Sequence, residues 1–111
     1  MRFEWDEAKN RRNLLKHRVR FETAALVFDD PYAITQRDES SEDEERWITF
    51  GAVGHGTLLV VVHKCVEGNE DVTRIISARA VESRERKIYE EAYQGAKTRH
   101  RRHRGHERRR H

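Results

Sequence analysis

The chain has 111 residues, of which 35% are hydrophobic and 39% are charged. This length predicts one small domain with a thin core. No apolar run is long enough to cross a membrane, the single cysteine excludes an internal disulfide, and no charged-then-apolar leader opens the sequence. We therefore expect a protein of the reducing cytoplasm.

Charge is divided unevenly along the chain. Residues 97–111 carry eight Lys or Arg against one acidic residue, a net charge of +7, whereas residues 1–96 carry 15 basic and 19 acidic residues, a net charge of −4. We expect residues 1–96 to form the folded domain and residues 97–111 to be a tail, either disordered or a helical extension. The tail is a nonspecific appendage or a phosphate-binding arm whose affinity falls with salt. His100, His103 and His106 recur there every third residue, but without a fixed scaffold they do not predict a metal site.

A basic helix is predicted from the N-cap Asp6 to about His17. Its apolar face is narrow and consists of Ala8, Leu14 and Leu15. Its many cations make this helix either a solvated surface or a surface that faces phosphates or an acidic partner. These cations are Lys9, Arg11, Arg12 and Lys16.

A second helix is predicted after Arg20, because apolar residues follow at the spacing of one helical face and Asp29-Asp30-Pro31 ends the run. The apolar residues are Phe21, Ala24, Ala25 and Phe28. A last helix is predicted near the C-terminus, capped by Ser83 and ending near Gly95. It is expected to bury Ile88, Tyr89 and Ala92.

Four strands are predicted between these helices, over residues 33–36, 46–53, 58–66 and 72–79. The acidic run 38–45 must be an exposed loop, and glycines mark the turns near residues 54–56 and 68–69. The third strand is apolar on both faces until His63, which predicts a central position. Simple alternation in the fourth strand puts Arg74 with Ala78 on one face and Ile75 with Arg79 on the other.

These elements predict an α+β fold with two N-terminal helices, a four-stranded mainly antiparallel sheet and a C-terminal helix. The helices are expected against one face of the sheet, which leaves the other face open. On that open face, cations and imidazoles from several elements are expected to converge into one hollow. The expected members are Arg46, His63 and Arg79, with Lys16 or His17.

The order and content of short motifs between about Met1 and Glu91 resemble the BrnT toxin family. These motifs are Phe3-Glu4-Trp5-Asp6-Glu7-Ala8-Lys9-Asn10, Asn13, Lys16-His17, Val19, Phe21-Glu22, Phe28-Asp29-Asp30-Pro31, Glu45-Arg46, Leu58-Leu59-Val60-Val61-Val62-His63 and Arg74-Ile75-Ile76-Ser77-Ala78-Arg79. The resemblance implies a RelE-like fold and a metal-independent, cofactor-free endoribonuclease that inhibits growth by cleaving RNA. It also implies a BrnA-like antitoxin with a ribbon-helix-helix DNA-binding part, whose dimer would join two toxins in a heterotetramer. Contact with operator DNA would then be indirect, through the complex.

RNA cleavage without a metal uses the neighbouring 2′-hydroxyl as nucleophile, so the protein must move protons and stabilise charge on phosphorus. Imidazole suits the proton steps and guanidinium matches phosphate oxygens. The predicted charge stabilisers are Arg79 and Arg46. The acid/base candidates are His63 and His17, and Lys16 is expected to add positive charge. The resemblance favours Arg79, because RelE-like toxins keep an arginine at the end of the last strand. Candidate RNA-binding residues are Arg11, Arg12 and Tyr89.

Structural roles compete with these assignments. His63 could be a hydrogen-bonded structural residue, Arg74 could pair with a carboxylate such as Glu22, and Trp5 is expected to pack against the sheet. Cys65 is expected to be inert. The rival function is a catalytically weak module that binds an antitoxin or nucleic acid and acts in regulation of its operon.

The chain also departs from the family pattern at three helix ends. Arg18 stands where relatives have glycine, so a left-handed residue or a shifted helix end is expected. Thr23 replaces the usual acidic partner of a capping box, and Glu82 stands where a threonine cap is expected.

Overall fold

The computed structural model describes residues 1–43, 45–54 and 56–109, with the side chains of those up to residue 96. Its helices and strands follow the chain in the order strand, three helices, four strands and one long helix. They are β1 (Arg2–Glu4), α1 (Glu7–His17), α2 (Phe21–Ala24), the 3₁₀ helix η1 (Ala25–Asp29), β2 (Ile34–Arg37), β3 (Trp47–Val53), β4 (Thr57–Val66), β5 (Asn69–Ala80) and α3 (Ser83–Arg109).

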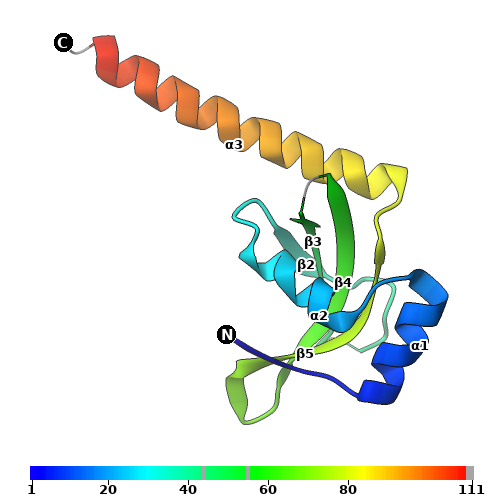
Figure 1. The fold of residues 1–111 in the computed structure, drawn as a ribbon. Helices are drawn as coiled ribbons and strands as arrows, with labels where there is room; N and C mark the ends of the chain where they lie inside the picture. Colours follow the sequence, from blue (N-terminus) through cyan, green and yellow to red (C-terminus); the bar gives the residue numbers. More distant parts are fainter. Residues whose placement is uncertain (44, 55, 110–111) are drawn as a thin grey trace.

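The sheet has five strands in the order β1-β5-β4-β3-β2, and β4 lies at its centre (Figure 1). The strands pair antiparallel except β1, which pairs parallel with β5 through Phe3 and Thr73. The predicted α+β fold and the central position of the third predicted strand are confirmed. The prediction of four strands is wrong, because the short N-terminal segment is a true edge strand.

Helices lie on both faces of the sheet. On the face that we call the core face, α2 and η1 cover a buried cluster to which Val61 and Ile75 belong. On the opposite face, the α3 face, Tyr89 of α3 packs with Phe50, Leu58 and Val60. The prediction of one wholly open face is therefore wrong. The α3 face is covered at one end and half-buried around Ile48 and Val62.

An irregularity in β5 breaks the predicted alternation of its side chains. Val62 pairs with Ser77, whereas the next residue, His63, pairs with Ile75. The skipped residue forms a β-bulge, which shifts the side chains on one side of it to the other face. As a result Ile75 and Ala78 are both buried in the core face.

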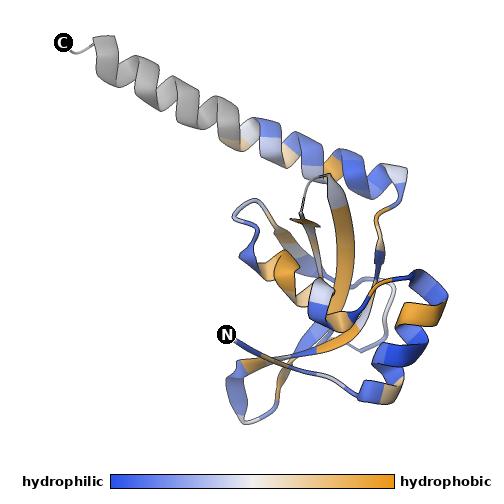
Figure 2. Ribbon diagram, in the orientation of Figure 1, coloured by the Kyte–Doolittle hydropathy of each residue, from blue (hydrophilic) through white to orange (hydrophobic). Residues whose placement is uncertain are grey.

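Polar side chains rather than an apolar stripe hold α1 on the sheet. Asn13 is only 7% exposed; its Nδ2 donates to the carbonyl oxygens of Val19 (2.9 Å) and Ala78 (2.8 Å) and its Oδ1 accepts from the Ala78 amide (3.1 Å). The predicted apolar face of this helix is wrong, because Ala8 and Leu15 are exposed. Largely hydrophilic, α1 contrasts with β4, which is hydrophobic along most of its length (Figure 2).

The caps of the first two helices follow the sequence-based expectations. The Asp6 carboxylate accepts from the amides of Ala8 and Lys9, and Arg18 ends α1 in the left-handed conformation with φ 61°. Arg20, the N-cap of α2, makes no side-chain cap hydrogen bond, in agreement with the predicted loss of the capping box. Instead, the buried Asn10 of α1 accepts a hydrogen bond from the Phe21 amide (2.8 Å).

The second predicted helix is shorter than expected and tightens into η1. A 3₁₀ helix has three residues per turn, so side chains three positions apart share a face. Ala24 and Val27 are accordingly fully buried, whereas Ala25 and Phe28, which the α-helical spacing placed in the core, are only half-buried.

The helix α3 differs from its prediction at both ends. Ser83 is its first helical residue rather than its cap, and the helix continues through Gly95 to Arg109 instead of stopping near Gly95 (Figure 1). Glutamate, lysine and arginine are good helix formers, and they outweigh the roughly 1 kcal/mol cost of one glycine. Of the residues expected to be buried, Tyr89 is buried and Ile88 and Ala92 are exposed. The division between domain and tail at residue 96 stays a prediction.

Candidate active site

A polar hollow of about 590 Å³ lies on the α3 face, where the end of β5 meets the first turn of α3. Its floor is apolar sheet surface from Ile48, Val60 and Val62. Its rim carries both signs of charge, so an anionic chain would bind there through particular arginines and not through the overall charge. The charged or polar rim residues are Gln36, Arg37, Asp38, Glu39, Ser40, Arg79, Glu82, Arg84 and Glu85.

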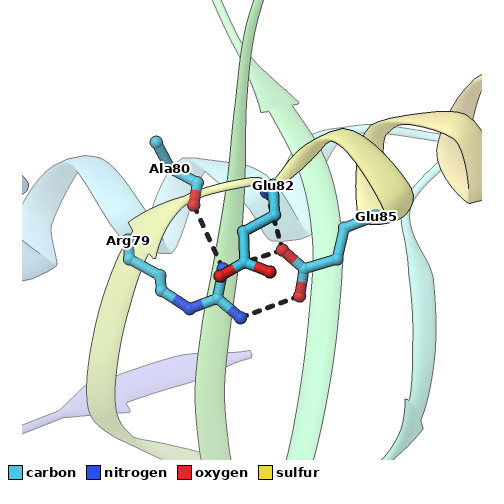
Figure 3. A network of polar contacts seen from close by, with 4 residues as sticks. All are labelled: Arg79, Ala80, Glu82 and Glu85. Carbon is cyan, nitrogen blue, oxygen red and sulfur yellow. Dashed lines mark hydrogen bonds and ion pairs between the residues drawn. The ribbon is translucent and has the colours of Figure 1, made fainter.

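Arg79 lies at this rim in a two-pronged ion pair with Glu85 (Figure 3). Its Nη1 and Nη2 donate to the two carboxylate oxygens, each at 2.7 Å, and Nη1 also donates to the Ala80 carbonyl oxygen at 3.2 Å. Hydrogen bonding to Glu85 raises the pKa of Arg79, and the same bonds lower the pKa of the Glu85 carboxyl. The guanidinium is therefore charged and held in one orientation.

Glu85 is a residue that sequence reasoning missed. It stands at the third position of α3 and also accepts a hydrogen bond from the Glu82 amide (2.8 Å), the arrangement of half a capping box. A glutamate three residues after a helix N-cap is a sequence signal that could have been read. The position of Glu85 beside Arg79 could not have been predicted, because it depends on the conformation of the turn between β5 and α3.

The ion pair leaves part of the guanidinium available. Arginine has five N–H donors, and the three hydrogen bonds to Glu85 and Ala80 use three of them. With 38% of the Arg79 side chain exposed, the remaining two donors can reach a phosphate oxygen in the hollow.

Arg46 and Lys64 form a second cationic group, held together by Asp43. The carboxylate lies 3.8 Å from Arg46 Nε and 3.8 Å from Lys64 Nζ. Lys64 shares the α3 face with Val62 through the alternation of β4, and Arg46 directly precedes β3. Among the described residues, the buried Nε of Arg46 has no hydrogen-bond partner.

Lys16 and His17 approach this face from the edge of β5. With Arg12, they line a smaller hollow of about 290 Å³ against Ser77. Ser77 lies opposite Val62 on the α3 face, two residues before Arg79. Lys16 and His17 therefore line a different hollow from Arg79, and the predicted convergence of these residues in one hollow is wrong. Arg11 is exposed on the same helix.

His63 lies on the other side of the sheet. It is 9% exposed, its ring packs edge-on against Phe28 with centroids 4.9 Å apart, and its Nε2 is 2.7 Å from Thr49 Oγ1. The Thr49 hydroxyl is in turn 2.8 Å from that of Thr35. The predicted convergence of His63 with Arg79 is wrong, because the pairing of β4 with β5 sends the two side chains to opposite faces.

Burial lowers the pKa of His63 to about 4, which predicts a pH-dependent stability. An unfolded histidine has a pKa near 6.5, so below that pH the unfolded chain binds a proton that the folded chain does not. The stability contributed by neutral His63 is complete above about pH 6.5 and is lost as the pH falls toward 4. We expect urea unfolding to show about 2 kcal/mol less stability at about pH 5 than at pH 7.5 from this group.

The variant His63→Gln tests this assignment, because it removes the ionisable group from the same buried position. It should be less stable than the parent at pH 7.5 and should lose much less stability between pH 7.5 and 5. An equal pH dependence in parent and variant would show that other groups are responsible.

Tyr89, proposed from sequence as a stacking residue, is 7% exposed. Its hydroxyl donates to Asp30 Oδ2 (2.7 Å), which also accepts from the Ala52 amide (2.8 Å). Burial and this hydrogen bond raise the pKa of Tyr89. The side chain fastens α3 to the sheet and does not offer its ring to a base.

Three further expectations concern side chains away from the hollow. Arg74 pairs with a carboxylate as predicted, and the partner is Glu4 (3.6 Å) instead of the suggested Glu22. The Trp5 ring packs edge-on against Phe21 with centroids 6.1 Å apart. Cys65 is a free, exposed thiol. The histidines of the tail lie outside the described side chains.

Comparison with known proteins identifies the family. A family model described as "Ribonuclease toxin, BrnT, of type II toxin-antitoxin system" matches residues 5–85. The chain belongs to the BrnT toxin family. The crystal structure of the Brucella abortus ribonuclease toxin BrnT is 21% identical, with a TM-score of 0.59, and the alignment covers 75% of this chain and 99% of that chain. No curated protein matches significantly.

As a BrnT ribonuclease toxin of a type II system, the protein is an endoribonuclease with a cognate antitoxin. The structural likeness to the Brucella toxin shows that the fold is the BrnT fold. None of the described helices is long and apolar enough to span a membrane.

Proposed function

We propose that this BrnT-family protein cleaves RNA on the α3 face without a metal ion. The substrate's own 2′-hydroxyl loses its proton to a base and attacks the adjacent phosphorus. The bond from phosphorus to the 5′-oxygen breaks, that oxygen takes up a proton, and a 2′,3′-cyclic phosphate is left. Arg79 stabilises the negative charge that develops on the phosphate oxygens. The observation that carries the proposal is the position of Arg79 at the rim of the hollow, with two N–H donors not used by Glu85 or Ala80.

Other residues supply the remaining parts of the reaction. His17 is the candidate acid or base, since it lies beside Ser77 at the edge of this face. Lys16 and Arg46 contribute positive charge, and Arg11 and Arg12 extend the RNA-binding surface along α1. Glu85 positions Arg79. His63 has no part in this chemistry, because it is buried on the core face.

In the cell, the proposed reaction arrests growth, and a BrnA-like antitoxin with a ribbon-helix-helix part neutralises it. An antitoxin dimer would hold two toxins and place the complex on operator DNA, so that the toxin contacts the operator only indirectly. Membership of a type II toxin family supports the existence of a cognate antitoxin. That this antitoxin is BrnA-like is part of our proposal.

A second candidate function is that of a catalytically weak antitoxin-binding or nucleic-acid-binding module that acts in operon autoregulation. The specific observation in its favour is the ion pair itself, because Glu85 competes with any phosphate for the fork of Arg79. A chain that is toxic only weakly would still bind its antitoxin.

Incubation of the purified chain with RNA in excess EDTA separates the two functions. The nuclease proposal expects cleavage that EDTA leaves unchanged and that a 2′-deoxy substitution at the cleaved nucleotide abolishes. Induced expression should also arrest growth, and coexpressed antitoxin should relieve the arrest. Harmless expression together with intact RNA would favour the binding module, and cleavage lost in EDTA would refute the metal-free mechanism.

A further inference from the structure

The last 15 residues of the chain, 97–111, are strongly basic, and the reaction proposed above does not use them. They carry eight Lys or Arg and one acidic residue. The backbone of α3 continues as a helix through this stretch to Arg109 and projects away from the sheet (Figure 1). The match to the family model ends at residue 85, so these residues lie outside the part of the chain that shows the family.

We propose that this extension, the basic arm, is an RNA-anchoring element that raises affinity for the substrate through its phosphates. The inference rests on the proposed function, in which RNA is the substrate. It adds a second binding site, independent of sequence, to the cationic groups on the α3 face.

The need for such an arm follows from the charge of the remaining chain. Residues 1–96 carry a net charge of −4, so the body as a whole repels a polyanion. The cations of the candidate site are moreover partly neutralised, Arg79 by Glu85, and Arg46 and Lys64 by Asp43. The net charge of +7 on the arm is enough to reverse the sign of the whole chain, which has a formal net charge of +3.

The position of the arm suits it to hold the same RNA strand that enters the hollow. The helix that carries the arm begins at Ser83, and Glu85 of its first turn binds Arg79. At 1.5 Å per residue, residue 97 lies only about 20 Å along the helix from Ser83. At a phosphate spacing of roughly 3.4 Å per strand, this distance corresponds to about six nucleotides.

The pattern of the arm is that of a phosphate binder rather than of a protein-binding helix. No apolar residue follows Ala96, so the arm has no hydrophobic stripe with which to pack on a partner helix. Its eight Lys and Arg are distributed over all 15 residues, which is typical of a sequence that binds phosphates through charge.

Binding to a non-cleavable probe tests the arm apart from catalysis. The probe is a 2′-O-methyl oligoribonucleotide of about 20 nucleotides, whose blocked hydroxyl cannot act as nucleophile, and binding is measured by fluorescence anisotropy at several salt concentrations. The test variant changes the eight Lys and Arg of residues 97–111 to Gln in the full-length chain. We expect roughly 10- to 100-fold weaker binding and a log–log salt slope shallower by about 4, as for the loss of about six phosphate contacts to a single strand.

Two full-length controls define what the arm does. A chain with the sequence of residues 97–111 scrambled should bind within about two-fold of the parent, because the attraction depends on charge and not on sequence. The double variant Arg86→Gln/Lys87→Gln, which removes two charges from the body part of α3, should change the salt slope by at most about 1.4. Circular dichroism and thermal unfolding confirm that each variant is folded.

Unchanged affinity and salt slope in the neutralised variant would overturn the proposal. Binding of parent and neutralised variant to phosphatidylserine vesicles is measured in parallel. If neutralisation abolishes vesicle binding but leaves RNA binding intact, the arm binds membranes and the proposal is also overturned. If the parent binds the probe through the arm but cleaves no RNA, the arm stands and the nuclease proposal fails. If the parent cleaves RNA and neutralisation changes neither binding nor salt slope, the nuclease proposal stands and the arm fails.

Discussion

Arg79→Ala should reduce RNA cleavage by about 10²- to 10³-fold and abolish growth arrest on induction. A donor aimed at charge that develops in the transition state contributes about 3–4 kcal/mol in typical enzymes. Arg79 is one of three arginines at the rim of the hollow, and Glu85 holds its guanidinium through both Nη atoms. Cleavage of labelled RNA under single-turnover conditions measures the effect.

Several variants separate a catalytic role of Arg79 from a structural one. Loss of the guanidinium leaves the Glu85 carboxylate, whose side chain is 13% exposed, without its partner, so Arg79→Ala should also be less stable. The double variant Arg79→Ala/Glu85→Ala removes that unpaired charge and should recover stability without recovering cleavage. Arg79→Lys keeps the positive charge but loses the planar guanidinium with its paired N–H donors. It should therefore cleave RNA little faster than Arg79→Ala.

A control lies one turn into α3. Arg86 is half exposed and approaches Glu90 only at 4.0 Å, so Arg86→Ala should cleave RNA at close to the parent rate. Cleavage by Arg79→Ala at the parent rate would refute the assignment of Arg79. Equal losses in the two variants would point to a general charge effect instead of a specific donor.

Asn13→Ala should lower the free energy of unfolding by about 3 kcal/mol. One side-chain amide satisfies three backbone groups, the carbonyl oxygens of Val19 and Ala78 and the amide of Ala78. Each buried polar group left without a partner costs about 1–3 kcal/mol, and water that enters the gap recovers part of the total. Urea unfolding measures the change.

Leu15→Ala is the control for the same helix. Leu15 is apolar but 78% exposed, so its truncation should change stability by less than about 0.5 kcal/mol. If Leu15→Ala lowered the free energy of unfolding more than Asn13→Ala, α1 would pack through an apolar stripe, as its sequence alone suggested.

Local signals in the sequence predicted much of this fold. The N-cap Asp6, the left-handed Arg18 and the missing cap at Arg20 follow from residue types and short spacings, and each agrees with the structure. The continuous apolar run of β4 predicted its central place, because a strand paired on both sides and covered on both faces has no polar side.

The errors came from features that depend on distant partners. The bulge in β5 is a property of its pairing with β4, and it moved Ile75 to the face opposite Arg79. The same register, invisible in either strand alone, separates His63 from Arg79. No packing role was predicted for Asn13, because its hydrogen bonds depend on Ala78, 65 positions further along the chain.

The asparagine bridge has a mechanical consequence. Asn13 forms hydrogen bonds with both backbone polar groups of Ala78, and the next residue along the strand is Arg79. The helix α1, which carries Lys16 and His17, is thus joined directly to the strand that carries the Arg79 guanidinium. A partner that separated this helix from β5 would break these hydrogen bonds and remove a support of the strand next to Arg79, without contacting the hollow.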